Sequence, residues 1–181
     1  GTTILAAAKS VGISIPTLCY LNLSDFGCVN TPSSCRMCLV EVEGRRNLAP
    51  ACVTPAADKM TVSTNSVRAL KTRKTMLELL LSDHPKDCLT CQKSGNCELQ
   101  SLADKFSIRD IKLKGEQSAY RLDISKSLIR DMDKCIMCRR CETMCNEVQT
   151  VGVLSAINRG FESVIATAME INLSDSVCTY C

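Results

Sequence analysis

Hydrophobic and polar positions follow a clear period over only short stretches of this chain, and each stretch predicts one element. Helix-favouring residues at 4–9 follow Thr3, which predicts a helix of about two turns capped by that threonine. Apolar and polar residues alternate over 39–43, and the pattern returns over 47–51 after a turn that contains glycine, which predicts a β-hairpin. The chain therefore opens with a small unit of mixed helix and strand.

The longest helical pattern covers residues 66–81. One face of this helix is predicted to carry Val67, Leu70, Lys74, Leu77 and Leu81. The cations of the same helix are expected to form a solvated stripe with snorkelling stems, made of Lys71, Arg73 and Lys74. Elsewhere the patterns predict a short strand within 58–64, a helix over 98–105, a polar surface loop over 111–118, and a hairpin that turns at 158–160.

Composition changes this picture through cysteine. The chain has 181 residues and 14 cysteines, with 3% aromatic residues, no tryptophan and one histidine. In a short secreted chain such a density would suggest a disulfide scaffold. Here the cysteines cluster at metal-ligand spacings instead, which indicates a reducing cytoplasm and clusters that help to fill the interior.

Charge and hydropathy argue against two classes of protein, those that bind nucleic acid and those that span a membrane. The formal net charge is +3, but the lysines and arginines are scattered and no aromatic stacking platform accompanies them, so nucleic-acid binding is not expected. No apolar run approaches the roughly 20 residues of a membrane span, and no signal peptide is visible. No phosphate-binding glycine loop, Ser/His/Asp set or paired catalytic carboxylate is present, so the chain is expected to carry electrons rather than to transform a substrate.

The most specific motif is a CxxCxxCxxxC run formed by Cys135, Cys138, Cys141 and Cys145. Three cysteines at this spacing can direct their sulfurs at one [4Fe–4S] cluster, and the fourth lies about one helical turn later and faces elsewhere. This is the bacterial ferredoxin spacing, in which the fourth cysteine ligates the other cluster of a pair. A zinc site of CxxC type does not require three evenly spaced cysteines with a fourth just after them, so an iron–sulfur cluster is favoured over zinc or disulfides.

A second CxxC, Cys178 and Cys181, supplies part of the other half of this pair. If Cys145 joins Cys178 and Cys181 on one cluster, each of the two clusters still lacks one ligand. Both missing ligands are then expected just after residue 181, so we expect the ferredoxin unit to be cut at its C-terminal end.

A third motif combines the single histidine with three cysteines: His84, Cys88, Cys91 and Cys97. A lone histidine is usually a surface or core residue, but a cubane cluster needs four ligands and neutral imidazole can supply the fourth. Replacing one thiolate by imidazole removes a negative charge, which favours the reduced cluster and should raise its reduction potential, as in Rieske centres.

The segments PTLCY, CRMCLVEVEG and LAPACVTP resemble the N-terminal [2Fe–2S] domain shared by [FeFe]-hydrogenases, the large peripheral subunit of complex I and NAD-linked formate dehydrogenases. The resemblance implies a β-grasp, plant-ferredoxin-like fold with ligands at Cys19, Cys35, Cys38 and Cys52, and the HxxxCxxCx5C spacing occurs in the same families. The first hairpin of that fold would precede residue 2, so we expect the domain to be trimmed at its N-terminal end. An insertion before Cys35 carries Cys28, which is an alternative ligand to Cys19 or else a partly buried free thiol.

Among these families the double-cubane spacing disfavours complex I, and formate dehydrogenase shares it. The segments CRRCETMCNEVQTVG and INRGFESVIATA are most similar to the catalytic subunit of multimeric NAD(P)-linked [FeFe]-hydrogenases. The resemblance implies an H-cluster in a domain after residue 181, a flavin- and NAD(P)-binding partner subunit, a small [2Fe–2S] subunit and, in electron-bifurcating complexes, ferredoxin. The alternatives are the same region of a formate dehydrogenase or complex I-like subunit, or a free electron-transfer protein.

These observations predict an α+β chain of three parts. Residues 1–64 form a [2Fe–2S] β-grasp domain, 65–120 a small helical domain with the His/Cys3 [4Fe–4S] cluster, and 121–181 a truncated bacterial-type two-[4Fe–4S] ferredoxin domain. The expected cofactors are one [2Fe–2S] and three [4Fe–4S] clusters, which use every cysteine except Cys28.

Overall fold

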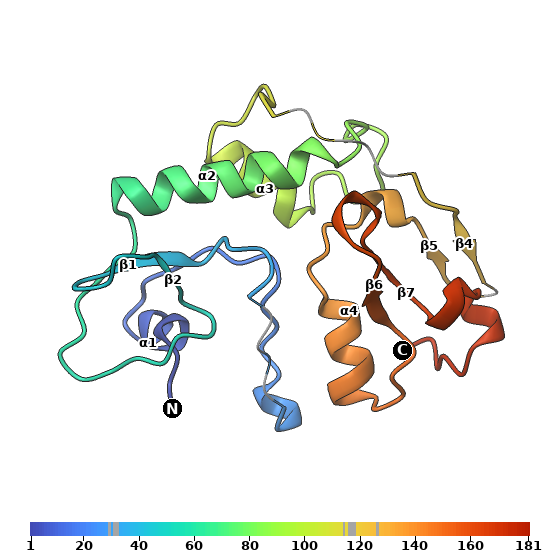
Figure 1. The fold of residues 1–181 in the computed structure, drawn as a ribbon, viewed down its shortest axis with the longest axis horizontal. Coiled ribbons are helices and arrows are strands. Elements are labelled where there is room, and N and C mark those ends of the chain that lie inside the picture. Colours follow the sequence, from blue (N-terminus) through green and yellow to red (C-terminus); the bar gives the residue numbers. More distant parts are fainter. Residues whose placement is uncertain (29, 31–32, 114, 116–118, 126) are drawn as a thin grey trace.

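The computed structural model describes residues 1–28, 30, 33–113, 115, 119–125 and 127–181. Short helices and strands alternate with long connections (Figure 1). The helices are α1 (Ile4–Ser10), α2 (Val67–Ser82), α3 (Glu98–Lys105) and α4 (Arg140–Thr143). The strands are β1 (Leu39–Val42), β2 (Ala49–Pro50), β3 (Val62–Ser63), β4 (Asp123–Ile124), β5 (Ile129–Arg130), β6 (Ser155–Ile157) and β7 (Val164–Ala166).

Single helical turns occupy the connections. Those of 3₁₀ type lie at Ser24–Phe26, Met132–Lys134, Gly160–Glu162, Ala168–Glu170 and Leu173–Asp175. A π-helical turn, η3 (Met144–Val148), continues α4. Such π turns widen a helix locally and often mark functional positions. In this chain the turn contains Cys145.

The N-terminal part is a three-stranded antiparallel sheet with α1 packed against it. The strand order is β2–β1–β3, and Val40 lies opposite Ala49 while Val42 lies opposite Val62. The predicted hairpin over 39–51 and the short strand within 58–64 are therefore confirmed. The predicted threonine cap is also confirmed, because the amide of Ala6 donates to Oγ1 of Thr3 at 3.2 Å. This sheet and helix bury a compact aliphatic core that includes Ile4, Val40 and Ala51.

Helix α2 has the predicted length, but its buried face differs from the prediction. The helix begins after Ser66, whose Oγ accepts a hydrogen bond from the amide of Ala69 at 3.2 Å. The buried positions are Ala69, Arg73 and Leu77, spaced four residues apart, whereas Val67 is 83% exposed. The prediction failed because the face was chosen by its leucines and valine, and an arginine gives no apolar signal at a buried position.

The prediction that Arg73 belongs to a solvated stripe of cations is therefore wrong. Its side chain is only 1% exposed and faces β1, while Lys71 and Lys74 on the same helix are exposed as expected. The guanidinium can be buried because a backbone carbonyl of β1 accepts two of its hydrogen bonds.

The C-terminal part contains two small hairpins and the helix α4. The predicted hairpin that turns at 158–160 is confirmed by the β6–β7 pairing, in which Ala156 lies opposite Ile165. Asn158 adopts a positive φ of 59° in this turn, a conformation that asparagine tolerates better than most residues. The pairing of β4 with β5 was not predicted, because strands of two residues show no period. The surface loop predicted over 111–118 falls partly outside the described residues.

A second apolar core joins the parts of the molecule. Its fully buried members are Leu18, Cys19, Cys35, Met37, Leu77 and Leu99, and partly buried residues packed against it include Cys97, Ile136 and Cys138. In Figure 1 helix α2 lies above β1 and β2, and α4 with β4–β7 lies at the other end of the molecule. No helix within the described part of the chain is long and apolar enough to cross a membrane.

Candidate iron–sulfur sites

The first four cysteines predicted as ligands are buried in the N-terminal part. Cys19, Cys35, Cys38 and Cys52 are each at most 5% exposed. The β1–β2 hairpin brings Cys38, at its start, beside Cys52, just after its end, and their sulfurs lie 3.3 Å apart. The amide of Leu18 donates to Sγ of Cys35 at 3.4 Å, which holds the loop that contains Cys19 against the turn before β1.

These four thiols form two pairs, Cys19 with Cys35 and Cys38 with Cys52. A hydrogen bond donated by Cys35 lowers the pKa of Cys19 to about 5, and donating it raises the pKa of Cys35. Likewise Cys52 lowers the pKa of Cys38 to about 7, and its own pKa is raised. In each pair one thiol is thus favoured as thiolate, and the other holds a proton that metal binding would displace.

The spacing within a pair suits a shared metal ion. Metal–thiolate bonds of about 2.3 Å place two thiolates of one tetrahedral ion roughly 3.8 Å apart, so a sulfur–sulfur distance of 3.3 Å needs little adjustment. Two such pairs are what a [2Fe–2S] cluster requires, with two thiolates on each iron. The donor set therefore fits the cluster that the sequence predicted.

Cys28, the alternative ligand, lies outside this group. Its thiol donates to the carbonyl oxygens of Phe26 at 3.4 Å and Glu147 at 3.3 Å. The insertion that carries Cys28 thus reaches the π-helical turn η3, far along the chain, rather than the paired cysteines.

His84 follows α2 and lies near the start of the loop with Cys88, Cys91 and Cys97. Burial lowers the pKa of His84, so its ring is neutral near pH 7, and its buried Nδ1 has no hydrogen-bond partner among the described residues. A neutral imidazole whose ring nitrogen lacks a partner is suited to metal ligation. Cys88 is exposed, whereas Cys91 and Cys97 are half-buried.

The CxxC turns of the C-terminal part share one local geometry. The amide of Met137 donates to Sγ of Cys135 at 3.4 Å, and the amide of Tyr180 donates to Sγ of Cys178 at 3.5 Å. Met137 and Tyr180 occupy the same place in their turns, and both have positive φ, at 50° and 55°. Amide hydrogen bonds to thiolate sulfur stabilise its negative charge and tune the potentials of iron–sulfur clusters. The two CxxC turns therefore present their first cysteine in the same local geometry.

A cavity of about 330 Å³ gathers cysteines from both motifs of this region. Cys145, Cys178 and Cys181 line it together with Cys141, and apolar side chains form most of the remaining wall. Cys145 is buried, and its Sγ accepts a hydrogen bond from the amide of Val153 at 3.2 Å. The structure thus brings Cys145 to the same cavity as the C-terminal CxxC, as the ferredoxin spacing predicted, but it also brings Cys141 there, which the spacing assigned to the other cluster.

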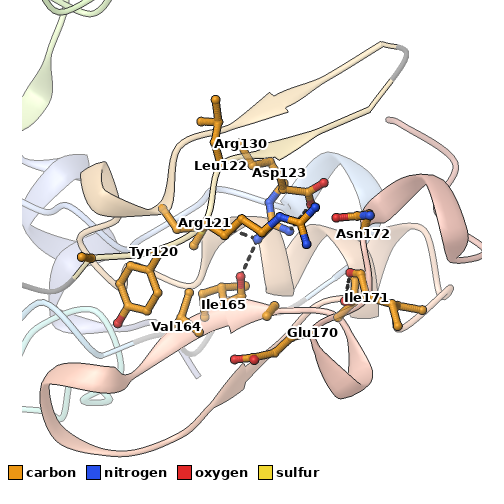
Figure 2. A pocket seen from close by; sticks show the side chains of 14 residues that line it. Tyr120, Arg121, Leu122, Asp123, Arg130, Val164, Ile165, Glu170, Ile171 and Asn172 are labelled. Atoms are coloured by element: carbon orange, nitrogen blue, oxygen red, sulfur yellow. Dashed lines mark hydrogen bonds and ion pairs between the residues drawn. The ribbon is translucent and has the colours of Figure 1, made fainter.

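Arg130 lies between this cavity and a second one. It lines the cysteine cavity and also a polar cavity of about 380 Å³ between β4 and β7, seen in Figure 2. Its guanidinium pairs with the largely buried Asp123 at 3.3 Å and donates to the carbonyl of Ile165. None of the described residues that line the polar cavity is a cysteine, so it is not a cluster site. Sequence reasoning missed Arg130, because a lone arginine in a short strand carries no signal.

Two ion-paired groups connect the His84 loop and α3 to the C-terminal part. Lys134 lies 3.2 Å from Asp87 and 3.4 Å from Asp131, and Arg140 lies 2.8 Å from Glu98. These side chains are partly exposed, so solvent screens each pair and its contribution to stability is small. The Lys134–Asp87 pair lies directly beside two predicted ligands, because Asp87 precedes Cys88 and Lys134 precedes Cys135.

No group of three or more His, Cys, Asp or Glu side chains in the described segments is close enough to hold a single metal ion. A zinc site needs such convergence on one point. An iron–sulfur cluster occupies the space between its ligands, which can therefore lie around a cavity or in separated pairs.

Comparisons with known proteins agree with this geometry. Residues 1–67 match the family described as a 2Fe-2S iron-sulfur cluster binding domain, and 73–112 match the NADH-ubiquinone oxidoreductase-G iron-sulfur binding region. The chain is 66% identical to NADP-reducing hydrogenase subunit HndD of Solidesulfovibrio fructosivorans. That match covers all of this chain and 31% of the relative. The chain is 39% identical to the G 2 subunit of NADH-quinone oxidoreductase from Rhizobium meliloti, over all of this chain and 21% of that protein.

A solved structure shows a similar fold. The crystal structure of an NAD⁺-reducing [NiFe]-hydrogenase in the H₂-reduced state contains a chain that superposes with a TM-score of 0.87 at 30% identity. The match covers 99% of this chain and 74% of that one. Fold, cysteine arrangement and matches together define an iron–sulfur electron-transfer region of an oxidoreductase. The chain belongs to the family of iron–sulfur regions that NAD(P)-linked hydrogenases share with the G subunits of NADH-quinone oxidoreductases.

Proposed function

We propose that residues 1–181 are the electron relay of the catalytic subunit of a multimeric, NAD(P)-linked [FeFe]-hydrogenase. The observation that carries the proposal is the second apolar core, which packs Cys19 and Cys35 together with Cys97 and Cys138. These cysteines come from all three predicted cluster regions. Ligands that pack in or against one apolar core hold their clusters close together, which is what stepwise electron transfer requires.

The ligands are assigned to four clusters. One [2Fe–2S] cluster takes Cys19, Cys35, Cys38 and Cys52, in the fold expected to be of β-grasp type. One [4Fe–4S] cluster takes His84, Cys88, Cys91 and Cys97. Two further [4Fe–4S] clusters take Cys135, Cys138 and Cys141, and Cys145, Cys178 and Cys181, each with one more ligand. The buried pairs, the neutral His84 and the cysteine-lined cavity support this assignment.

The residues around the ligands prepare the sites. When bound, the clusters accept and pass single electrons. Paired thiols hold a thiolate ready for iron, amides at Met137 and Tyr180 donate to sulfur, and the apolar walls exclude water. Low solvent exposure and hydrogen bonds to sulfur are the means by which a protein sets cluster potentials.

The choice of [FeFe] rather than [NiFe] chemistry rests on two observations. The segments 138–152 and 157–168 resemble [FeFe]-hydrogenase sequences. The matched region also makes up only 31% of the hydrogenase relative, against 74% of the matched chain from the [NiFe] complex. The hydrogenase relative therefore has room for a large further domain in the same polypeptide, where we place the H-cluster.

The implied partners are a flavin- and NAD(P)-binding subunit and a small [2Fe–2S] subunit, with ferredoxin as a further electron carrier in a cytoplasmic complex. The names of the two hydrogenases include reduction of NADP or NAD⁺, which supports a nicotinamide-linked partner. The likeness to a subunit of NADH-quinone oxidoreductase also supports a nicotinamide as the electron carrier, although that enzyme passes the electrons to quinone.

Metal analysis of the intact complex tests the proposal. After anaerobic purification, this region and the residues that complete its sites should account for about fourteen irons, with matching sulfide. The complex should also evolve H₂ without nickel. Iron sufficient for only two clusters in this region, or stoichiometric zinc, would contradict the cluster assignment. Stoichiometric nickel with hydrogenase activity would instead contradict the [FeFe] assignment.

Serine substitutions test the crossed arrangement of the two ferredoxin clusters. Cys145→Ser and Cys178→Ser should each perturb the same EPR signal, because both side chains line one cavity. Cys138→Ser should perturb a different signal, since its sulfur belongs to the other cluster. If Cys145→Ser and Cys138→Ser altered the same signal and spared the one affected by Cys178→Ser, the crossed arrangement would be wrong.

A further inference from the structure

Arg73 is a buried cation that the cluster assignment does not use. It lies in the middle of α2 with 1% of its surface exposed, the largest side chain among the fully buried residues that the structure describes. Its Nε and Nη2 donate to a single acceptor, the carbonyl oxygen of Leu39, at 3.0 and 2.7 Å. Leu39 directly follows Cys38, so the guanidinium contacts the backbone beside a predicted ligand.

No carboxylate among the described residues forms an ion pair with Arg73. The arginines that do form ion pairs in this part of the chain are 109, 130, 139 and 140. Burial of a charge without a partner is strongly unfavourable, and buried charges in folded proteins are therefore paired. A carbonyl dipole satisfies hydrogen bonds but does not neutralise a positive charge. The neutralising charge must come from something else near β1.

The cysteine site supplies negative charge that acts on Arg73. Burial lowers the pKa of Arg73, and the thiolate of Cys38 acts in the opposite direction and favours the charged guanidinium. A [2Fe–2S] cluster with four thiolates is net anionic, and its reduction adds a further negative charge. In a buried site this attraction is weakly screened, so it is much stronger than at the protein surface.

We propose that Arg73 is the counter-charge of the [2Fe–2S] site and a positioning residue that raises its reduction potential. The proposal rests on the proposed function, in which Cys38 is a ligand of that cluster. A fixed positive charge stabilises the reduced form more than the oxidised form, because the reduced form is more negative. Removing the charge should therefore lower the potential.

The position of Arg73 also connects two regions. It lies outside residues 1–67, which match the [2Fe–2S] family, and inside 73–112, which match the neighbouring iron–sulfur family. The electrostatics of the first cluster site are thus set in part by a helix of the next region.

The test compares three variants of the full-length protein in its complex: Arg73→Met, Arg73→Lys and Lys74→Met. Arg73→Met removes the buried charge and keeps much of the apolar volume. Lys74→Met removes a positive charge from the exposed side of the same helix and is the matched control. Arg73→Lys keeps the charge but cannot reproduce the two-nitrogen contact with the carbonyl of Leu39. The readout is a redox titration of the [2Fe–2S] EPR signal.

For Arg73→Met we expect the reduction equilibrium constant to fall at least tenfold, which corresponds to about 59 mV for one electron. Lys74→Met should change it by less than about threefold, because exposed charges are screened. Arg73→Lys should remain closer to wild type than Arg73→Met, even if the protein melts at a lower temperature. A merely structural arginine would affect melting without moving the potential.

An unchanged potential in Arg73→Met, with or without loss of thermal stability, would overturn the proposal. If Arg73→Met does not retain the cluster, Arg73→Lys decides: a smaller change than tenfold supports the counter-charge, and a fall of tenfold or more overturns it. The wild-type protein separates a failure of the cluster assignment from a failure of the role proposed for Arg73. Absence of any [2Fe–2S] signal there would overturn the proposed function first, and the role of Arg73 with it.

Discussion

The largest expected effect is the loss of the [2Fe–2S] cluster in Cys19→Ser and its full retention in Cys28→Ser. Cys19 is 1% exposed and hydrogen-bonded to Cys35, so serine would replace one of two thiolates on the same iron. Cys28 instead donates to backbone carbonyls, those of Phe26 and Glu147. Visible absorption, EPR and iron content should show a loss of about two irons for Cys19→Ser and none for Cys28→Ser.

Cys35→Ser provides the matched control, since Cys35 is the partner of Cys19. It should reproduce the spectrum of Cys19→Ser. The reverse result, an intact cluster in Cys19→Ser and a lost cluster in Cys28→Ser, would show that the insertion supplies the ligand. It would also require the loop around Cys28 to leave its contact with η3.

The second large effect is expected at His84. His84→Ala should make the His/Cys3 cluster labile and favour a three-iron form, because the remaining cysteines supply only three ligands. His84→Cys should keep four irons but lower the reduction potential, since thiolate adds a negative charge to the cluster. Each 59 mV of this one-electron shift corresponds to about 1.4 kcal/mol.

Redox titration with EPR on both variants measures this effect. The signal to follow is the one that differs from wild type, and its midpoint potential is compared with the wild-type value. His84 is suited to the role because burial lowers its pKa and leaves the ring neutral, with Nδ1 unpartnered among the described atoms. An unchanged spectrum and midpoint in His84→Ala would exclude His84 as a ligand. A raised potential in His84→Cys would contradict the charge argument even if the cluster remained intact.

Cluster chemistry was predictable from sequence because ligand spacing is a local property. CxxC turns place two sulfurs on one side of a loop wherever they occur, and the turns at Cys135 and Cys178 repeat the same backbone conformation. Helix boundaries were predictable for a similar reason. Thr3 and Ser66 each cap a helix through contacts within three residues.

Long-range contacts were beyond the reach of the same reasoning. The buried face of α2 was misassigned because nothing near Arg73 in the sequence reveals the carbonyl of Leu39, which lies 34 residues earlier. The apolar core that joins Cys19, Cys97 and Cys138 likewise depends on how three loops meet. The β4–β5 pair was missed because two-residue strands are defined by their partners and not by their own periodicity.

The shared apolar core has a consequence for how such chains can be divided and recombined. The two family matches treat the cluster regions as successive modules. However, Leu77 and Leu99 belong to a core that also contains Cys19 and Cys35, predicted ligands of the first site, and Ile136 packs against it. A cut between the regions would expose apolar surface on both fragments and open Cys19 and Cys35 to solvent and oxygen. We therefore expect fragments to need compensating substitutions at these positions before they hold clusters alone. Exchange of single regions between relatives should succeed only when the core residues are exchanged with them.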